Sequence, residues 1–331
     1  MKGFLRGLSY YGVWTLLKAG QTFVMIFPAR VVSRFATFLA DAGFFLAPRV
    51  RRTSVANLAM ALGGEMEASV LDRVARQSMR NFFLDMPEIG HALQIDREQF
   101  RDEITVSGLE HLDAALAKGK GVIALGAHLG NFCLVGARLA AEGHPVSVLV
   151  KPPRNLRIAG LMDGYRQKLG QKTVRARPRL QATRELIRLL RDNEIAVVIA
   201  DEFRSNGITA PFFGHPVAAR RGPVTLALRT GAAVVPVYMF RQANGRLALM
   251  IEPELHLTWS GRLTEDIRSN TVLVTAWLEQ VVRAHPEQWN WMVVRWQEGL
   301  RDLPHRSRRR FRKHPSSSRL AGQKSDRKEL S

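Results

Sequence analysis

The chain has 331 residues, a formal net charge of +20 and 46% hydrophobic residues, so it can fold as one large domain or two smaller ones. Its single cysteine excludes an internal disulfide and a cysteine-built zinc site, and it favours a reducing compartment. The nine histidines have no metal-ligand spacing, so no metal site is expected. The positive charge favours a polyanionic partner: nucleic acid, an anionic bilayer or phosphorylated substrates.

The first predicted element is an apolar stretch over residues 4–27, interrupted by Arg6, Lys18 and Gln21. A spanning helix needs about 20 mostly apolar residues, and a lysine near its centre costs roughly 2.5–3.5 kcal/mol. The stretch therefore favours an anchor that lies in the membrane interface or enters it obliquely. A single span and a packed core helix are the alternatives. No small-residue cleavage site follows, so a signal peptide is not expected.

A second apolar stretch, residues 35–46, leads into a basic cluster at residues 48–52. Basic residues beside apolar helices suit the anionic cytoplasmic leaflet of a membrane. Strand signals are few up to residue 100, and amphipathic spacing recurs over residues 69–81. Residues 1–100 are therefore predicted to form an N-terminal helical membrane-associating region.

After about Glu103 the pattern changes to apolar runs of strand length that alternate with helical spacing. The predicted strands cover residues 121–127, 146–150, 196–200, 232–240 and 247–251. The predicted helices cover residues 109–117, 131–142, 156–169, 181–191, 222–230 and 265–284. This alternation predicts an α/β domain over residues 101–300, with a mixed, largely parallel sheet flanked by helices.

The last segment differs in kind from the rest of the chain. Residues 301–331 carry eleven Lys or Arg against three Asp or Glu, with few large apolar residues, which predicts a basic disordered tail. The tail is either solvated or bound to anionic lipid headgroups. Nucleic acid is not an expected partner, because neither interleaved aromatic residues nor a binding motif accompanies the charge.

The most informative segment is residues 128–133, His-Leu-Gly-Asn-Phe-Cys. It follows the predicted strand 121–127 and begins the predicted helix 131–142. In open α/β sheets the carboxyl ends of strands border the ligand crevice. A histidine there can accept a proton near neutral pH, so His128 is the candidate general base.

Further segments place this histidine in a family pattern. They are the acidic pair Asp201-Glu202, residues 210–216 (Ala-Pro-Phe-Phe-Gly-His-Pro), residues 221–236 from Arg-Gly-Pro to Val-Val-Pro, residues 285–291 (His-Pro-Glu-Gln-Trp-Asn-Trp) and residues 52–58 (Arg-Thr-Ser-Val-Ala-Asn-Leu). In order and spacing they resemble the late acyltransferases of bacterial lipid A biosynthesis, within the glycerolipid acyltransferase superfamily. The similarity runs from about residue 10 to residue 300.

The resemblance implies a membrane-bound enzyme on the cytoplasmic face of the inner membrane, with a glycerolipid acyltransferase-like fold. It would move an acyl chain from acyl carrier protein to a hydroxyl of a glycolipid, without a cofactor. In the superfamily pattern HxxxxD/E, a histidine removes the proton of the hydroxyl and a carboxylate orients the imidazole. His128 matches the base. Gly130 and Asn131 match the residues between base and acid, and both are predicted to bind substrate, with Asn131 at the border of the polar substrate site.

Cys133 occupies the position of the acid, and it leaves several readings open. Another carboxylate, Asp201 or Glu202, orients His128, or Cys133 itself ionises. Alternatively, the protein has lost the chemistry and binds glycolipid or acyl carrier protein as a non-catalytic paralogue. A third reading makes the thiol a nucleophile that carries the acyl chain. Cys133 is otherwise a small buried residue with no role. Retained acyl transfer is the favoured reading.

Four basic residues are candidates for binding the anionic substrates. Lys151 stands where relatives commonly have arginine, and Arg154 offers a fork that lysine lacks. Arg221 is either solvated or in contact with the substrate or the carrier protein. Of the family's basic residues near residue 295, only Arg295 remains. The phenylalanines of residues 210–214 either pack in a turn or line the acyl groove.

Overall fold

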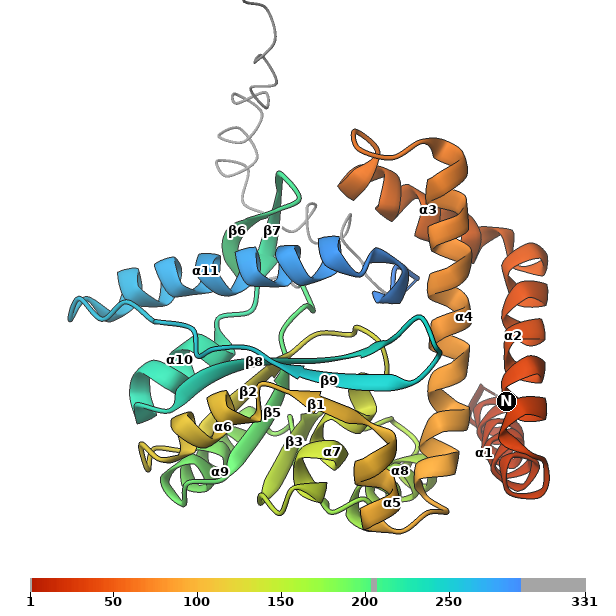
Figure 1. The fold of residues 1–331 in the computed structure, drawn as a ribbon, viewed down its shortest axis with the longest axis horizontal. Helices are drawn as coiled ribbons and strands as arrows, with labels where there is room; N and C mark the ends of the chain where they lie inside the picture. Colours follow the sequence, from red (N-terminus) through yellow and green to blue (C-terminus); the bar gives the residue numbers. More distant parts are fainter. Residues whose placement is uncertain (1, 204–206, 293–331) are drawn as a thin grey trace, which may run out of the picture.

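The computed structural model describes residues 2–203 and 207–292. The predicted tail, 301–331, and Arg295 lie outside these residues. An α/β core and an N-terminal group of helices pack against each other, and helix α4 stands between helices α1 and α2 and the sheet (Figure 1). The N-terminal helices are α1 (Lys2–Ile26), α2 (Ala29–Leu46), α3 (Pro48–Leu62) and α4 (Ala68–Ala92).

A seven-stranded sheet has the order β1-β9-β8-β2-β5-β3-β4. Its strands are β1 (Thr105–Ser107), β2 (Val122–Gly126), β3 (Val146–Val150), β4 (Gln171–Arg175), β5 (Ile195–Ile199), β8 (Ala233–Arg241) and β9 (Leu247–Ile251). Every pairing is parallel except that of β8 with β9. The predicted mixed, largely parallel sheet is therefore confirmed.

Helices connect the strands and cover both faces of the sheet. They are α5 (Arg97–Glu103), α6 (Leu109–Leu116), α7 (Val135–Ala141), α8 (Leu156–Lys168), α9 (Arg179–Arg191), α10 (Gly222–Thr230) and α11 (Leu263–Ala284), with the short 3₁₀ helices η1 (Phe132–Leu134) and η2 (Pro286–Gln288). In the central strand β2, Ile123 and Leu125 join the core under α10 and α11, whereas Val122 and Ala124 join the core under α6 and α7. Strands buried on both faces read as continuous apolar runs, as β2 does.

Some elements differ from those predicted. The prediction missed β1 and β4, and residues 208–219 form a hairpin of β6 (Ile208–Phe212) and β7 (His215–Ala219) that the prediction did not include. The helix predicted from residue 131 begins as the 3₁₀ turn η1, and its α-helical part starts only at Val135. Exposed basic residues in β4 and two prolines in the hairpin account for two of these differences.

The N-terminal helices are joined to the core by polar contacts as well as by packing. Ser78 Oγ on α4 donates to the carbonyl oxygen of Trp289 over 2.6 Å, and Asn81 Nδ2 donates to that of Glu287 over 2.8 Å. Among the residues described, no single helix has both the length and the apolar composition for a membrane span. Helices α2 and α3 have them only as a pair, and the chain bends by 90° between the two.

Candidate active site

His128 lies on the loop after β2, and Asp201 lies just beyond the end of the neighbouring strand β5. The two strands are parallel, with Gly126 paired to Ile199, so their carboxyl ends bring both side chains together. His128 Nδ1 and Asp201 Oδ1 are 2.7 Å apart, and the backbone N–H of His128 donates to Asp201 Oδ2 over 2.8 Å. The predicted base thus meets one of the two carboxylates proposed to orient it.

Trp289 supplies a further hydrogen bond to the same carboxylate. Its indole Nε1 donates to Asp201 Oδ2 over 2.7 Å, and the whole side chain is buried. The segment that carries it pairs with the histidine loop: Asn290 N donates to the carbonyl oxygen of His128, and Gly130 N to that of Gln288. The sequence contained Trp289 within a family segment but gave no sign of this bond, which joins residues 88 positions apart.

Gly130 is required by the backbone of this loop. Its φ is +51°, and a Cβ there would lie 2.1 Å from the carbonyl oxygen of Met239 on β8. A side chain at this position would push the loop away from the sheet. Gly130 also lines the pocket described below, so the substrate-binding role predicted for it can only be that of a backbone group.

The ionised Asp201 and the protonated His128 stabilise each other's charge. The Asp201 side chain is 1% exposed and that of His128 is 30% exposed. Burial opposes both charged forms, but the attraction and hydrogen bond between the two prevail: they lower the pKa of Asp201 and, with a contribution from Glu202, raise the pKa of His128. Because Asp201 is then ionised and accepts at Oδ1, Nδ1 of His128 carries a proton. In the neutral ring, Nε2 is left as the acceptor.

A small pocket opens beside His128 and is lined by three parts of the chain. One face of α4 supplies Ser78, Asn81, Phe82 and Asp85; the histidine loop supplies His128, Gly130 and Phe132; and the last described segment supplies Gln288 and Asn290. The ring of Phe132 packs edge-on against His128 with the centroids 4.7 Å apart. The pocket therefore combines a base with both apolar and polar walls.

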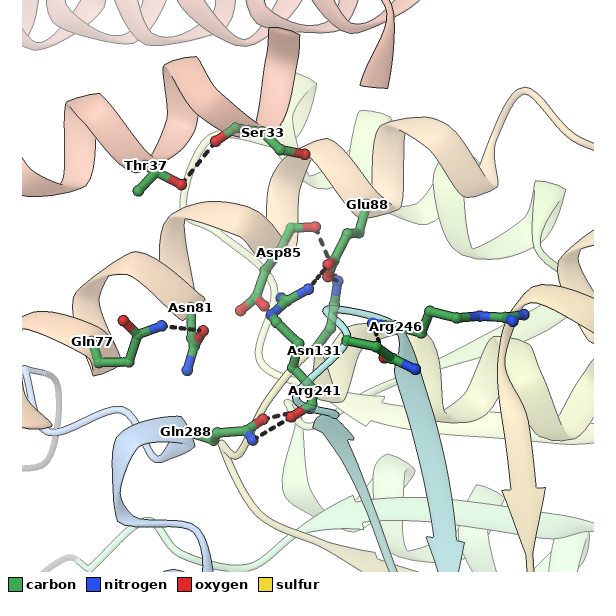
Figure 2. A network of polar contacts seen from close by, with 11 residues as sticks. Ser33, Thr37, Gln77, Asn81, Asp85, Glu88, Asn131, Arg241, Arg246 and Gln288 are labelled. Atoms are coloured by element: carbon green, nitrogen blue, oxygen red, sulfur yellow. Dashed lines mark hydrogen bonds and ion pairs between the residues drawn. The ribbon is translucent and has the colours of Figure 1, made fainter. Parts of the chain in front are cut away.

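Asn131 does not line this pocket, although the sequence placed it at the border of the substrate site. It is fully buried, and its Nδ2 donates to the backbone oxygen of Asp85 and to Glu88 Oε2. Glu88 also pairs with Arg241 from the end of β8 (Figure 2). Asn131 thereby fixes the loop to α4. None of Asp85, Glu88 and Arg241 was singled out from the sequence.

Cys133 follows in the first turn after the loop. It forms no hydrogen bond to His128 within the described part of the chain. Although Cys133 reaches the surface, burial of its thiol against the protein, and then the charge of Asp85, raise the pKa of the thiol to about 12 against the effect of Arg166. A thiol with that pKa is protonated at neutral pH, which disfavours both an ionised Cys133 and a nucleophilic one.

Glu202, the other candidate carboxylate, is held elsewhere. It pairs with Arg220, whose Nε also donates to the backbone oxygen of Glu202. Phe212 and Phe213 are buried and pack edge to face, and Phe212 also packs edge-on against Trp289. Of the two interpretations given for these phenylalanines, the structure has the packed turn, which supports the indole that binds Asp201.

The predicted basic residues lie at the same edge of the sheet as His128. Lys151 directly follows β3 and is exposed, and Arg154 is exposed in the loop before α8. Arg221 is the exposed N-cap residue of α10. None of the three lines the pocket beside His128. As exposed cations outside the pocket, they could attract an anionic molecule without contacting the reacting atoms.

Comparison with known proteins finds similarity to acyltransferases. A profile described as "Bacterial lipid A biosynthesis acyltransferase" matches residues 2–298. A phosphatidylinositol mannoside acyltransferase of Mycobacterium tuberculosis is 28% identical over 270 residues, which cover 77% of this chain and 79% of that protein. A lipid A biosynthesis palmitoleoyltransferase of Escherichia coli is 25% identical over 253 residues, 73% of this chain and 78% of the other. A lipid A biosynthesis acyltransferase of Haemophilus influenzae is 25% identical over 56% of this chain and 57% of its own.

Proposed function

The chain belongs to the bacterial lipid A biosynthesis acyltransferase family, and on that premise we propose that it moves a fatty acyl chain from acyl carrier protein to a hydroxyl of a lipid A-type glycolipid. The observation that carries the proposal is the His128–Asp201 pair beside the pocket, since such a pair is suited to deprotonating a hydroxyl. No cofactor enters the reaction, because the thioester supplies the activated acyl group.

In the proposed reaction, Nε2 of neutral His128 takes the proton of the acceptor hydroxyl as its oxygen attacks the thioester carbonyl carbon. A carbon–oxygen bond forms, and the carbon–sulfur bond then breaks. The departing thiolate of the carrier arm takes the proton from the imidazolium, which returns His128 to its neutral form. Asp201 stabilises the imidazolium between these steps and keeps the proton of Nδ1 in place, supported by Trp289.

Charge around the site supports anionic substrates. Lys151, Arg154 and Arg221 are exposed at the edge where the reaction would take place. Acyl carrier protein and phosphorylated glycolipids are both anionic, so these residues would concentrate both near His128. This is a role in steering and docking, in keeping with their absence from the pocket lining.

We also propose that α1 and α2 hold the enzyme at the cytoplasmic face of the inner membrane. Helix α2 buries Val32, Ala36, Ala40 and Phe44 against the protein, at a spacing of four residues. Its opposite side and the end of α1 expose large apolar side chains: Met25, Ile26, Phe27, Val31, Phe35, Phe38, Leu39, Phe45 and Leu46. Arg30, Arg34, Arg49 and Arg52 are exposed nearby. An apolar face with adjacent arginines suits an anchor in the interface of an anionic membrane.

The test is a transfer assay with the purified full-length protein in detergent. Labelled acyl-acyl carrier protein is the donor, and a lipid A precursor and a phosphatidylinositol mannoside are offered as separate acceptors. We expect transfer to the lipid A precursor by the wild type, loss of transfer in His128→Ala, and normal transfer in His256→Ala, which changes an exposed histidine outside the site. Full activity of folded His128→Ala would refute the role of the base.

Because Cys133 occupies the position of the family's acid, a second candidate function is binding without catalysis. A non-catalytic paralogue would bind glycolipid or acyl carrier protein without turnover. Binding of either molecule with no transfer to either acceptor by the wild type would favour that function over the proposed one.

A further inference from the structure

Two buried oxygen atoms in the pocket beside His128 lack a hydrogen-bond partner. Asp85 is 7% exposed, and its Oδ1 receives no hydrogen bond from any residue that the structure describes. Asn290 is 6% exposed, and its Oδ1 is likewise unpartnered within that part of the chain. Both residues line the pocket with His128. Buried polar atoms are nearly always satisfied, so a ligand group or an ordered water is expected at these two oxygens.

The neighbours of Asp85 are engaged elsewhere (Figure 2). Arg241 pairs with Glu88, and Asn131 donates to Glu88 and to the backbone of Asp85 instead of to its carboxyl group. Burial, and then the charge of Glu88, raise the pKa of Asp85 well above its usual range, against the effect of Arg241. The fold therefore places a carboxyl group in the pocket wall whose Oδ1 accepts no hydrogen bond from the described residues.

Unlike these two oxygens, other polar groups of the pocket are hydrogen-bonded within the protein. Ser78 Oγ and Asn81 Nδ2 line the same pocket, and each donates to a backbone carbonyl of the last described segment. The hydroxyl hydrogen of Ser78 and one amide hydrogen of Asn81 are thus used by the protein. The two buried side-chain atoms of the pocket that lack a partner among the described residues are oxygens, which accept from O–H or N–H groups.

We propose that Asp85 and Asn290 bind the sugar of the acceptor through hydroxyl groups next to the one that His128 deprotonates. This rests on the proposed function and adds the residues that select the acceptor. A sugar places several hydroxyls close to the reacting one, and Asp85 and Asn290 line the same pocket as His128. The thioester carbonyl and the acyl chain have no hydrogen to donate. Asp85 would bind in either protonation state, since a carboxyl group accepts hydrogen bonds and its acid form also donates one.

The first test compares wild type with Asp85→Ala and Asn290→Ala in the full-length enzyme. We expect Asp85→Ala, which removes both carboxyl oxygens, to raise KM for the lipid A precursor about tenfold and to leave KM for acyl-acyl carrier protein unchanged, with a smaller rise for Asn290→Ala. Asp266→Ala is the matched control: this buried carboxylate binds Ser260 at the far end of α11, so its loss should affect the melting temperature and neither KM.

The second test measures equilibrium binding of the lipid A precursor in detergent, without donor, to the same variants. We expect affinity about tenfold weaker in Asp85→Ala and no decrease in its melting temperature, because the change removes a carboxyl group beside Glu88. Unchanged acceptor affinity, or an increase in the KM of the donor alone, would overturn the proposal; the latter would assign Asp85 to the amides of the carrier arm. Weakened binding without any turnover by the wild type would support the acceptor pocket while refuting acyl transfer.

Discussion

Replacing Asp201 by asparagine tests the proposed chemistry most directly. Asp201 Oδ2 accepts from two donors, the backbone N–H of His128 and the indole of Trp289, while Oδ1 faces Nδ1 of His128. Asparagine has one acceptor oxygen, which the two fixed donors would hold at the Oδ2 position. Its NH₂ group would then point at Nδ1 and force that nitrogen to accept. Neutral His128 would carry its proton on Nε2 and could not remove one from a hydroxyl.

The magnitude follows from this change of tautomer. Loss of the carboxylate from a buried histidine–aspartate pair, with the geometry preserved, lowers kcat on the order of 10⁴-fold, or about 5 kcal/mol in activation free energy. The pKa of His128 should fall as well, because Asp201 is what raises it against the effect of burial. The lowered pKa of Asp201 means that the ionised carboxylate stabilises the fold above its usual titration range, and this contribution is lost as pH falls through the lowered pKa.

The assay is single-turnover acyl transfer, with thermal melting of each variant as the folding control. Glu202→Gln is the matched variant, because it neutralises the adjacent carboxylate, which pairs with Arg220 instead of His128. We expect it to stay within about twofold of the wild type. If folded Asp201→Asn retains more than about a tenth of wild-type activity, the tautomer argument is wrong and another group holds His128.

Four further outcomes are expected. Trp289→Phe, which removes one hydrogen bond to Asp201, should lower kcat about tenfold in the same assay. A profile of kcat/KM over about pH 5–9 should rise through an apparent pKa above 6.5, because the base works only when neutral and the pKa of His128 is raised; a limb at or below 6.5 would contradict this. Cys133→Ala should stay within about threefold of wild-type activity, whereas Cys133→Glu should lower the melting temperature, because it adds an acid beside Asp85. Phe38→Asp should release more protein from sedimented membranes than Trp259→Asp, although both aromatic residues are 65% exposed; equal release would argue against α2 as the anchor.

The fold was predictable where the sequence has a strong period. β2, β3, β5, β8 and β9 are apolar runs, and each lies within about one residue of its predicted bounds. β4 was missed because it lies at the edge of the sheet and carries the exposed Lys172 and Arg175. The hairpin β6–β7 was missed because Pro211 and Pro216 argue against strands, yet they pair with each other where no ladder hydrogen bond is needed.

The site was predictable only in part, because the sequence shows which residues follow strands but not which strands are neighbours. His128 and Asp201 each follow a buried strand, and that position marked them as candidates. The two side chains meet because β2 and β5 are neighbours in the sheet, whose order here is β8-β2-β5-β3. The linear sequence does not reveal that order. Asp85 and Trp289 come from helix α4 and the last described segment, and neither has a local pattern that indicates its role.

The return of residues 286–291 to the histidine loop also bears on when the protein becomes competent during its synthesis. The indole of Trp289 donates to Asp201, its backbone oxygen accepts from Ser78 on α4, and Asn290 lines the pocket. The histidine loop, α4 and this segment can therefore come together only after the segment has left the ribosome. A nascent chain that stops before Trp289 contains the strands of the sheet and His128 but lacks the hydrogen bonds from Trp289 to Asp201 and from α4 to Trp289. Such a chain would stay inert while it still carried its apolar N-terminal helices, and the membrane could be reached before any acyl group is moved.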